Sequence, residues 1–223
     1  MKFNKESIKY ILFGISCLFI FVFGELARLF EPLYDNVYYG TLNSLFYDVI
    51  KAVLCIIGII VVCLLSRKFL NFRPLKSKEE SIKEELPIKN LIVLTLITTA
   101  CIALVSGLVG WQVKILADLG ERYTGLMVGL AAAKWGTSLV KIVIVIMMIN
   151  FFQKGMEMNI DNKHIPWGGI LLLLTFGIYE LIMKETTLPV VYLLFNVVYG
   201  EIHLLTHKNT IKSFLLIYLI YLL

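Results

Sequence analysis

Charged residues are scarce in this sequence, and so are prolines and paired cysteines. Charged residues make up 17% of the chain, and only five of its 223 residues are proline. The four cysteines form no Cys-x-x-Cys pair and all lie in apolar segments, so we expect buried free thiols rather than disulfides or metal ligands. Apolar residues make up 59%, whereas soluble domains average about 45–50%. This composition excludes an ordinary soluble domain and indicates a membrane protein.

The apolar residues gather into seven segments, several of which approach or exceed the roughly 20 residues needed to cross a bilayer. They are Tyr10–Phe30, Tyr47–Leu65, Leu91–Trp111, Thr124–Phe152, Trp167–Met183, Pro189–Leu205 and Phe214–Leu223. The last segment is too short for a full crossing unless it includes Thr210–Ser213. The sequence therefore predicts an all-α polytopic membrane protein. Its single domain, residues 1–223, is expected to be a bundle of six to seven transmembrane helices in the lipid bilayer.

Basic residues are distributed unevenly between the two sides of these segments. With the N-terminus in the cytoplasm, 14 of the 21 basic residues fall on the inner side and 5 on the outer side, in line with the positive-inside rule. We therefore predict a cytoplasmic N-terminus and a charged cytoplasmic loop over residues 71–90. Within that loop, Ser77-Lys-Glu-Glu80 fits the start of a short helix. The same bias explains the net charge of +5, so no nucleic-acid partner is expected.

Ionisable residues at membrane depth mark the first candidate site, because they are costly to place there. In the fourth segment, Gly125, Gly129 and Ala133 repeat at four-residue spacing, which lets helices approach closely. This helix is expected at the centre of the bundle, so Lys134 should face protein or water. Counting ~1.5 Å per residue from the outer ends places Lys134 and Glu201 at matching depths. We predict that they meet, either as a structural ion pair or as a substrate or proton site.

A polar stripe on the sixth segment marks a second candidate. Asn196, Gly200, His203 and His207 follow i, i+4, i+7 and i+11. Glu201 lies about 200° around the helix from His203, so the two are not an obvious catalytic pair. Replacing His203 with alanine is expected to have a mild effect on stability. The run His203-Leu-Leu-Thr-His207 lacks the Glu of the zinc-protease motif His-Glu-x-x-His, so neither a metal nor a cofactor is predicted. The candidate buried polar residues are Lys134, Glu180, Asn196, Glu201 and His203.

The last two segments are joined by Val197-Val-Tyr-Gly-Glu-Ile-His-Leu-Leu-Thr-His-Lys-Asn-Thr-Ile-Lys-Ser213, in which a glycine-containing helix ends in a threonine and a short basic turn. With Phe176-Gly-Ile-Tyr-Glu180 upstream, this order resembles the membrane core of the CAAX-protease and bacteriocin-processing (Abi) family. The resemblance covers residues 91–223. That family is recognised by Glu-Glu-x-x-x-Arg, by Phe-x-x-x-His on the next helix, and by a later His followed by Asn or Asp.

The catalytic positions of that family are replaced in this chain. Glu180 stands where Phe-x-x-x-His has its histidine, and Ile217 or Tyr218 stands at the last histidine. The first motif would fall in residues 137–144, where Lys141 is present and no Glu pair exists. The resemblance therefore implies a degenerate member, a pseudoprotease in a bacterial plasma membrane, that acts by binding partners in the cell envelope.

Three functions remain open on the sequence alone. The first is a non-catalytic membrane scaffold or regulator that binds a membrane or envelope protein. The second is a small-molecule transporter subunit or ligand-binding protein, with Lys134, Glu180, Asn196 and Glu201 lining a cavity. The third is an intramembrane protease that uses Glu180 and His203 in an unusual site. The third is disfavoured, because Glu180 lies near the outer end of its segment and His203 near the inner end of the next.

Overall fold

The computed structural model describes residues 4–27, 40–76, 86–109, 125–160, 162, 164–183 and 189–222. Within these ranges every regular element is helical, which confirms the all-α prediction, and each apolar segment corresponds to a helix. The helices are α1 (Lys5–Glu25), α2 (Gly40–Leu70), α4 (Ile88–Val109), α6 (Gly125–Glu157), α7 (Trp167–Leu172), the π-helix η2 (Leu173–Gly177), α8 (Ile178–Met183), α9 (Pro189–Leu205) and α10 (Thr210–Leu222). α7, η2 and α8 follow one another without a break. The predicted helix at Ser77–Glu80 lies outside the described residues.

Three of these helices are long and apolar enough to span a membrane. The candidate spans are Lys5–Glu25, Phe46–Leu70 and Ala132–Glu157, in α1, α2 and α6. Their lengths of 21, 25 and 26 residues correspond to about 30–40 Å of helix, which matches the thickness of a bilayer core. The described parts of the other helices are apolar but shorter.

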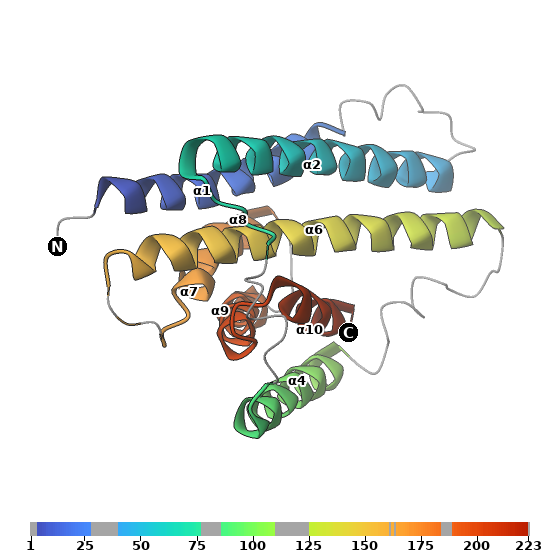
Figure 1. The fold of residues 1–223 in the computed structure, drawn as a ribbon. Coiled ribbons are helices and arrows are strands. Elements are labelled where there is room, and N and C mark those ends of the chain that lie inside the picture. The colour runs from blue at the N-terminus through green and yellow to red at the C-terminus, as the bar shows by residue number, and fades with distance from the viewer. Residues whose placement is uncertain are drawn as a thin grey trace.

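α1, α2 and α6 lie side by side as one layer, with α1 running opposite to the other two (Figure 1). The second half of α6 is the most deeply buried part of this layer. The side chains there that are almost completely buried are Ile142, Ile144–Ile149, Phe151 and Phe152. Gly14 of α1 leaves room for the Phe152 ring, since a Cβ there would come within 2.3 Å of it. The four cysteines are free thiols, three of them buried.

α6 is the central helix, in contact with α1, α2, α7 and α10. Its second half supplies most of the large buried side chains, and Gly155 near its end allows a close approach of α1. A Cβ on Gly136, in the earlier half, would meet nothing within 4 Å. The central position of this helix was predicted, whereas at Gly136 no neighbouring helix makes the close approach that its spacing suggested.

α4, α7, α9 and α10 form a second group on the other side of α6 from α1 and α2 (Figure 1). η2 and α8 reach α1, where the rings of Phe176 and Tyr179 lie against Phe21. α7 packs against α6 and α9, and α4 lies outermost, against α9 and α10. α9 runs across α6 rather than alongside it, and Figure 1 shows α9 nearly end-on while α6 lies in the plane. α7 and α9 touch through their backbones, because Gly200 and Gly169 leave no space for a Cβ: one on Gly200 would lie 2.5 Å from the Cα of Gly169.

Candidate functional site

The turn between α9 and α10 folds the chain back so that the two helices share a polar interior. His207 and Lys208 adopt left-handed backbone conformations with φ of 56° and 59°, which reverse the chain after Thr206. The side chain of Asn209 then accepts hydrogen bonds from the backbone amides of Ile211 and Lys212, each 3.1 Å long, and so caps the start of α10. One turn further, Ser213 faces back toward His203.

His203 is the centre of this interior. Its side chain is 1% exposed, its Nδ1 lies 2.9 Å from Ser213 Oγ, and its Nε2 lies 3.0 Å from Asn150 Oδ1. The hydroxyl of Thr206 lies 2.7 Å from that of Ser213. We call Asn150, His203, Thr206 and Ser213 the His203 cluster. It joins α6, α9 and α10.

The carbonyl of Pro74 determines how the amide of Asn150 is oriented toward His203. This carbonyl can only accept, and Asn150 Nδ2 donates to it at 2.9 Å. Asn150 Oδ1 therefore faces His203 and accepts from Nε2–H, so a neutral imidazole presents Nδ1 as an acceptor to the hydroxyl of Ser213. At the other side, the Ser213 hydroxyl lies 2.7 Å from both the carbonyl of Asn209 and the Thr206 hydroxyl. The Thr206 hydroxyl donates to the carbonyls of Ile202 and His203.

This arrangement binds helices together rather than presenting a reactive group. Both ring nitrogens of His203 are bonded to neutral partners, and His203 and Ser213 are almost completely buried, so neither a substrate nor a metal ion reaches the imidazole in this structure. Across the described ranges, no three His, Cys, Asp or Glu side chains lie close enough to hold a metal ion. A buried polar group whose bonds are satisfied contributes to the stability of one particular packing of helices.

Two further side chains of α6 extend the same polar face. Gln153 accepts at 2.8 Å from the backbone amide of Gly168, at the start of α7, and donates to Glu157 at 2.6 Å. Glu157 forms an ion pair of 2.5 Å with Lys208, in the turn between α9 and α10. Asn150, Gln153 and Glu157 follow i, i+3 and i+7, so one face of α6 holds the second group of helices.

The structure does not bring Lys134 and Glu201 together. Both side chains are half-buried, yet Glu201 makes no hydrogen bond or ion pair with any residue that the structure describes, and Lys134 has its interactions elsewhere. α9 touches α6 where His203 meets Asn150, and Lys134 lies about 24 Å further along α6 at ~1.5 Å per residue. Matching depth implies contact only between helices that run side by side, and α9 crosses α6.

The other sequence-predicted residues are placed as follows. Asn196 is 2% exposed and lies against η2, where a Cβ on Gly177 would come within 3.0 Å of its Nδ2. The stripe Asn196, Gly200 and His203 is therefore the face of α9 that points inward, and His207 at its end is exposed. The backbone of Glu180 lies in α8, and its side chain is outside what the structure describes.

One polar cluster was missed by the sequence analysis. Lys51 of α2 forms an ion pair with Glu25 at the end of α1, and the hydroxyl of Tyr47 donates to the same carboxylate at 2.8 Å. Lys51 Nζ also lies 3.3 Å from the hydroxyl of Tyr47. The available signal was a lone Glu at the end of one apolar segment and Tyr47/Lys51 at i,i+4 spacing in the next.

A second missed feature is the ammonium group of Lys141 on α6. It lies 5.1 Å from the ring centroid of Phe176, in the π-helix, and 5.0 Å from that of Tyr221 on α10. These distances are within the range of cation–π interactions. Its position in the middle of an apolar segment was the signal, since a charge at such a depth requires a partner.

Comparison with known proteins adds no relative: no protein-family model, no curated protein and no solved structure matches the chain.

Proposed function

We propose that this chain is a multi-pass plasma-membrane protein with a cytoplasmic N-terminus. In this proposal it acts as a non-catalytic scaffold or regulator that binds a helix of another membrane or envelope protein through α4. Three helices able to span a bilayer support the membrane location. The proposed role agrees with a degenerate, pseudoprotease relationship to the CAAX-protease and bacteriocin-processing family, which is part of the same proposal.

The engaged state of the interior polar groups supports a non-catalytic role. A serine bonded to a histidine that a third side chain orients is also the bonding pattern of a nucleophile and its base, but such a pair acts only where a substrate can reach it. His203 is 1% exposed and Ser213 is fully buried, so the His203 cluster is closed to a substrate in this structure. A protein whose interior polar groups stabilise its own packing acts on partners through its surface.

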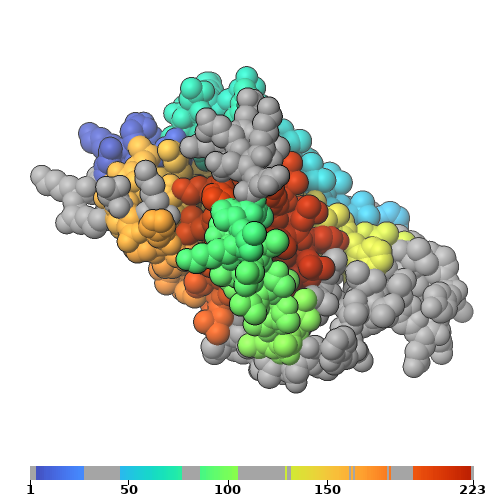
Figure 2. Space-filling model, turned by 60° about the horizontal axis from the view of Figure 1, so that its bottom comes forward, coloured from blue at the N-terminus to red at the C-terminus, as the bar shows by residue number. Residues whose placement is uncertain are grey.

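The outer side of α4 is the single observation on which partner binding rests. α4 buries Leu94, Thr98 and Cys101 against α9 and α10. Next to this buried stripe, Thr95, Thr99 and Ala103 are exposed at four-residue spacing. Small residues at this spacing form the closest helix–helix contacts in membranes. Figure 2 shows α4, in green, lying across α9 and α10 at the outside of the molecule, where a further helix has access to it.

Site-specific photo-crosslinking in cells tests this function. A photoreactive residue at Leu96 of α4, 64% exposed, should give one discrete protein adduct, and Thr99→Leu should abolish it by blocking close approach. The matched control is the same photoreactive residue at Leu64 of α2, which is 62% exposed. Equal adducts at both positions, or lipid adducts alone, would contradict the proposal. An adduct with a second copy of the chain would show that α4 binds the chain itself rather than a different protein.

A small-molecule carrier is the second candidate, favoured by two specific observations. Glu25, Tyr47 and Lys51 form a polar cluster between α1 and α2, and Lys141 lies against the π-helix. π-helical turns within α-helices are frequent at functional sites. A ligand that binds at the cluster of Glu25, Tyr47 and Lys51 should raise the melting temperature of the detergent-solubilised protein, and Lys51→Met should remove that rise. A rise that persists in the variant would place the ligand elsewhere.

A further inference from the structure

The chain leaves α2 through a turn that is attached to the core. Asn71 adopts a left-handed conformation with φ of 50°, and the amide of Phe72 donates 3.3 Å back to the carbonyl of Ser66, which closes the helix end. The ring of Phe72 then packs between Tyr10 of α1 and Phe151 of α6, with centroid distances of 5.3 and 5.4 Å. This segment is therefore held in one orientation relative to α1 and α6.

The next four residues form a β-turn that is anchored in the same way. The amide of Lys76 donates at 3.1 Å to the carbonyl of Arg73, with Pro74 in the second position that this turn favours. Pro74 is buried and its carbonyl accepts from Asn150 of the His203 cluster. Phe72 and Pro74 thus face the core, while the side chain of Arg73 between them is exposed.

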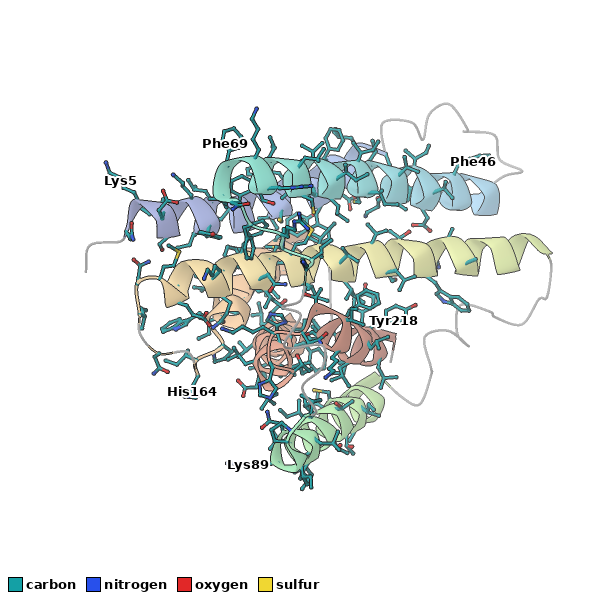
Figure 3. The ribbon with its side chains drawn as sticks, viewed as in Figure 1. Lys5, Phe46, Phe69, Lys89, His164 and Tyr218 are labelled. Atoms are coloured by element: carbon teal, nitrogen blue, oxygen red, sulfur yellow. The ribbon has the colours of Figure 1, made fainter. Side chains whose placement is uncertain are left out.

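The segment with Arg73 follows directly on the last turn of α2, which carries two further basic residues, and the bond from Phe72 to Ser66 holds it to that helix end. Arg67 and Lys68 are exposed, and none of the three has an acidic partner among the described side chains. Exposed apolar side chains accompany them: Phe69 is 62% exposed and Leu65 40%. We call Leu65, Arg67, Lys68, Phe69 and Arg73 the α2-end surface. Figure 3 labels Phe69 there, at the same end of the layer as Lys5.

We propose that the α2-end surface binds the headgroup of an anionic phospholipid. The candidate span Phe46–Leu70 ends at this surface, so it lies where acyl chains give way to headgroups. Guanidinium and ammonium groups form charge-assisted hydrogen bonds with phosphate oxygens, and basic residues next to a transmembrane helix attract anionic lipids. Phe69 and Leu65 contact the acyl chains of the same lipid. This site goes beyond the proposed function and depends only on the membrane location of α2.

Three other basic residues at this end, Lys5, Lys9 and Lys154, lie outside the turn that holds Arg73. Lys9 is paired with Glu6 at 2.6 Å, and Lys5 and Lys154 stand singly near the ends of α1 and α6. None of them lies on an anchored turn beside a second basic residue. They provide a control set with the same number of charges.

The test is lipid binding to the full chain in detergent, measured by native mass spectrometry with phosphatidylglycerol and phosphatidylcholine. The wild type should retain phosphatidylglycerol more tightly than phosphatidylcholine. The triple variant Arg67→Gln/Lys68→Gln/Arg73→Gln should lose roughly fivefold in phosphatidylglycerol affinity for each charge removed. The control variant Lys5→Gln/Lys9→Gln/Lys154→Gln should keep the wild-type affinity. Melting temperatures without lipid establish that both variants fold, as exposed substitutions should.

Three outcomes would overturn this proposal. Equal affinity of the wild type for the two lipids removes the need for an anionic headgroup. Equal losses of phosphatidylglycerol affinity in the two triple variants would mean that total charge, and not the α2-end surface, determines lipid binding. Complete displacement of the lipid by millimolar inorganic phosphate would mean that the ligand of this surface is free phosphate. The variant Thr99→Leu should leave lipid affinity unchanged, so a failure of partner binding through α4 is distinguishable from a failure of this site.

Discussion

At the scale of single residues, the burial of His203 changes the expected effect of its replacement. The sequence predicted a mild effect of His203→Ala on stability, but the side chain is 1% exposed and bonded to both α6 and α10. Its removal takes the donor away from Asn150 Oδ1, at about 1–3 kcal/mol for a buried group left unsatisfied, and opens a cavity where the ring was packed, whereas Ser213 keeps Thr206 and the carbonyl of Asn209. We expect a large fall in melting temperature in detergent. His207→Ala, in the turn after α9, alters an exposed side chain and should lower the melting temperature much less, so an equal fall in both variants would contradict this account.

The missing contact between Lys134 and Glu201 gives a second prediction at this scale. A buried ion pair would make each single variant, Lys134→Met or Glu201→Gln, costly and the double variant partly restored. Since the structure does not join them, we expect the two changes in unfolding free energy to add within about 0.3–0.5 kcal/mol. A double-mutant cycle measured by thermal unfolding in detergent checks this. A coupling energy above about 1 kcal/mol would restore the predicted pair.

At the scale of helices, the contact between α7 and α9 depends on two glycines. A Cβ on Gly200 would lie 2.5 Å from both the Cα and the amide nitrogen of Gly169, and helix backbones cannot rotate away as a side chain can. Gly200→Ala should therefore destabilise by about 1–3 kcal/mol. Gly136→Ala is the matched control, because open space surrounds that position. It should stabilise by about 0.4–1 kcal/mol through the lower entropy of the unfolded chain. Thermal unfolding of the two variants should move in opposite directions, and a destabilised Gly136→Ala would mean that α6 has a neighbour there.

The helices could be predicted from the sequence far better than their contacts. Runs of apolar residues and the bilayer thickness are enough to locate a helix, so all seven apolar segments correspond to helices. Hydropathy contains no information on tilt, which is set by packing, and so the crossing of α9 over α6 was not predicted. The same limit applies to the His203 cluster. His203 itself is unusual in an apolar segment, whereas Asn150 and Ser213 are neutral, common in loops, and identified as its partners only by the fold.

At the scale of the whole molecule, the position of the helix ends allows a test of topology. The start of α1 and the ends of α2 and α6 lie at one end of the layer (Figure 1), so they face the same side of a membrane together. The surplus of basic residues at that end predicts that this side is the cytoplasm. Single cysteines at Lys5 and Lys154, both exposed, should resist a membrane-impermeant thiol reagent in intact cells and react after lysis.

A cysteine at Thr186, in the predicted outer turn between residues 184 and 188, should react in intact cells. The parent chain retains its four native cysteines, three of which are buried, and its own labelling sets the background. Reaction of both Lys5→Cys and Lys154→Cys from outside would reverse the orientation while keeping the layer. Reaction of only one of the two would place the start of α1 and the end of α6 on opposite sides of the membrane. That result would contradict the arrangement of these helices in one layer. The pattern of three labels therefore tests two predictions independently. The positive-inside rule predicts which side of the membrane the start of α1 and the end of α6 face. The helix arrangement predicts that these two helix ends lie on the same side.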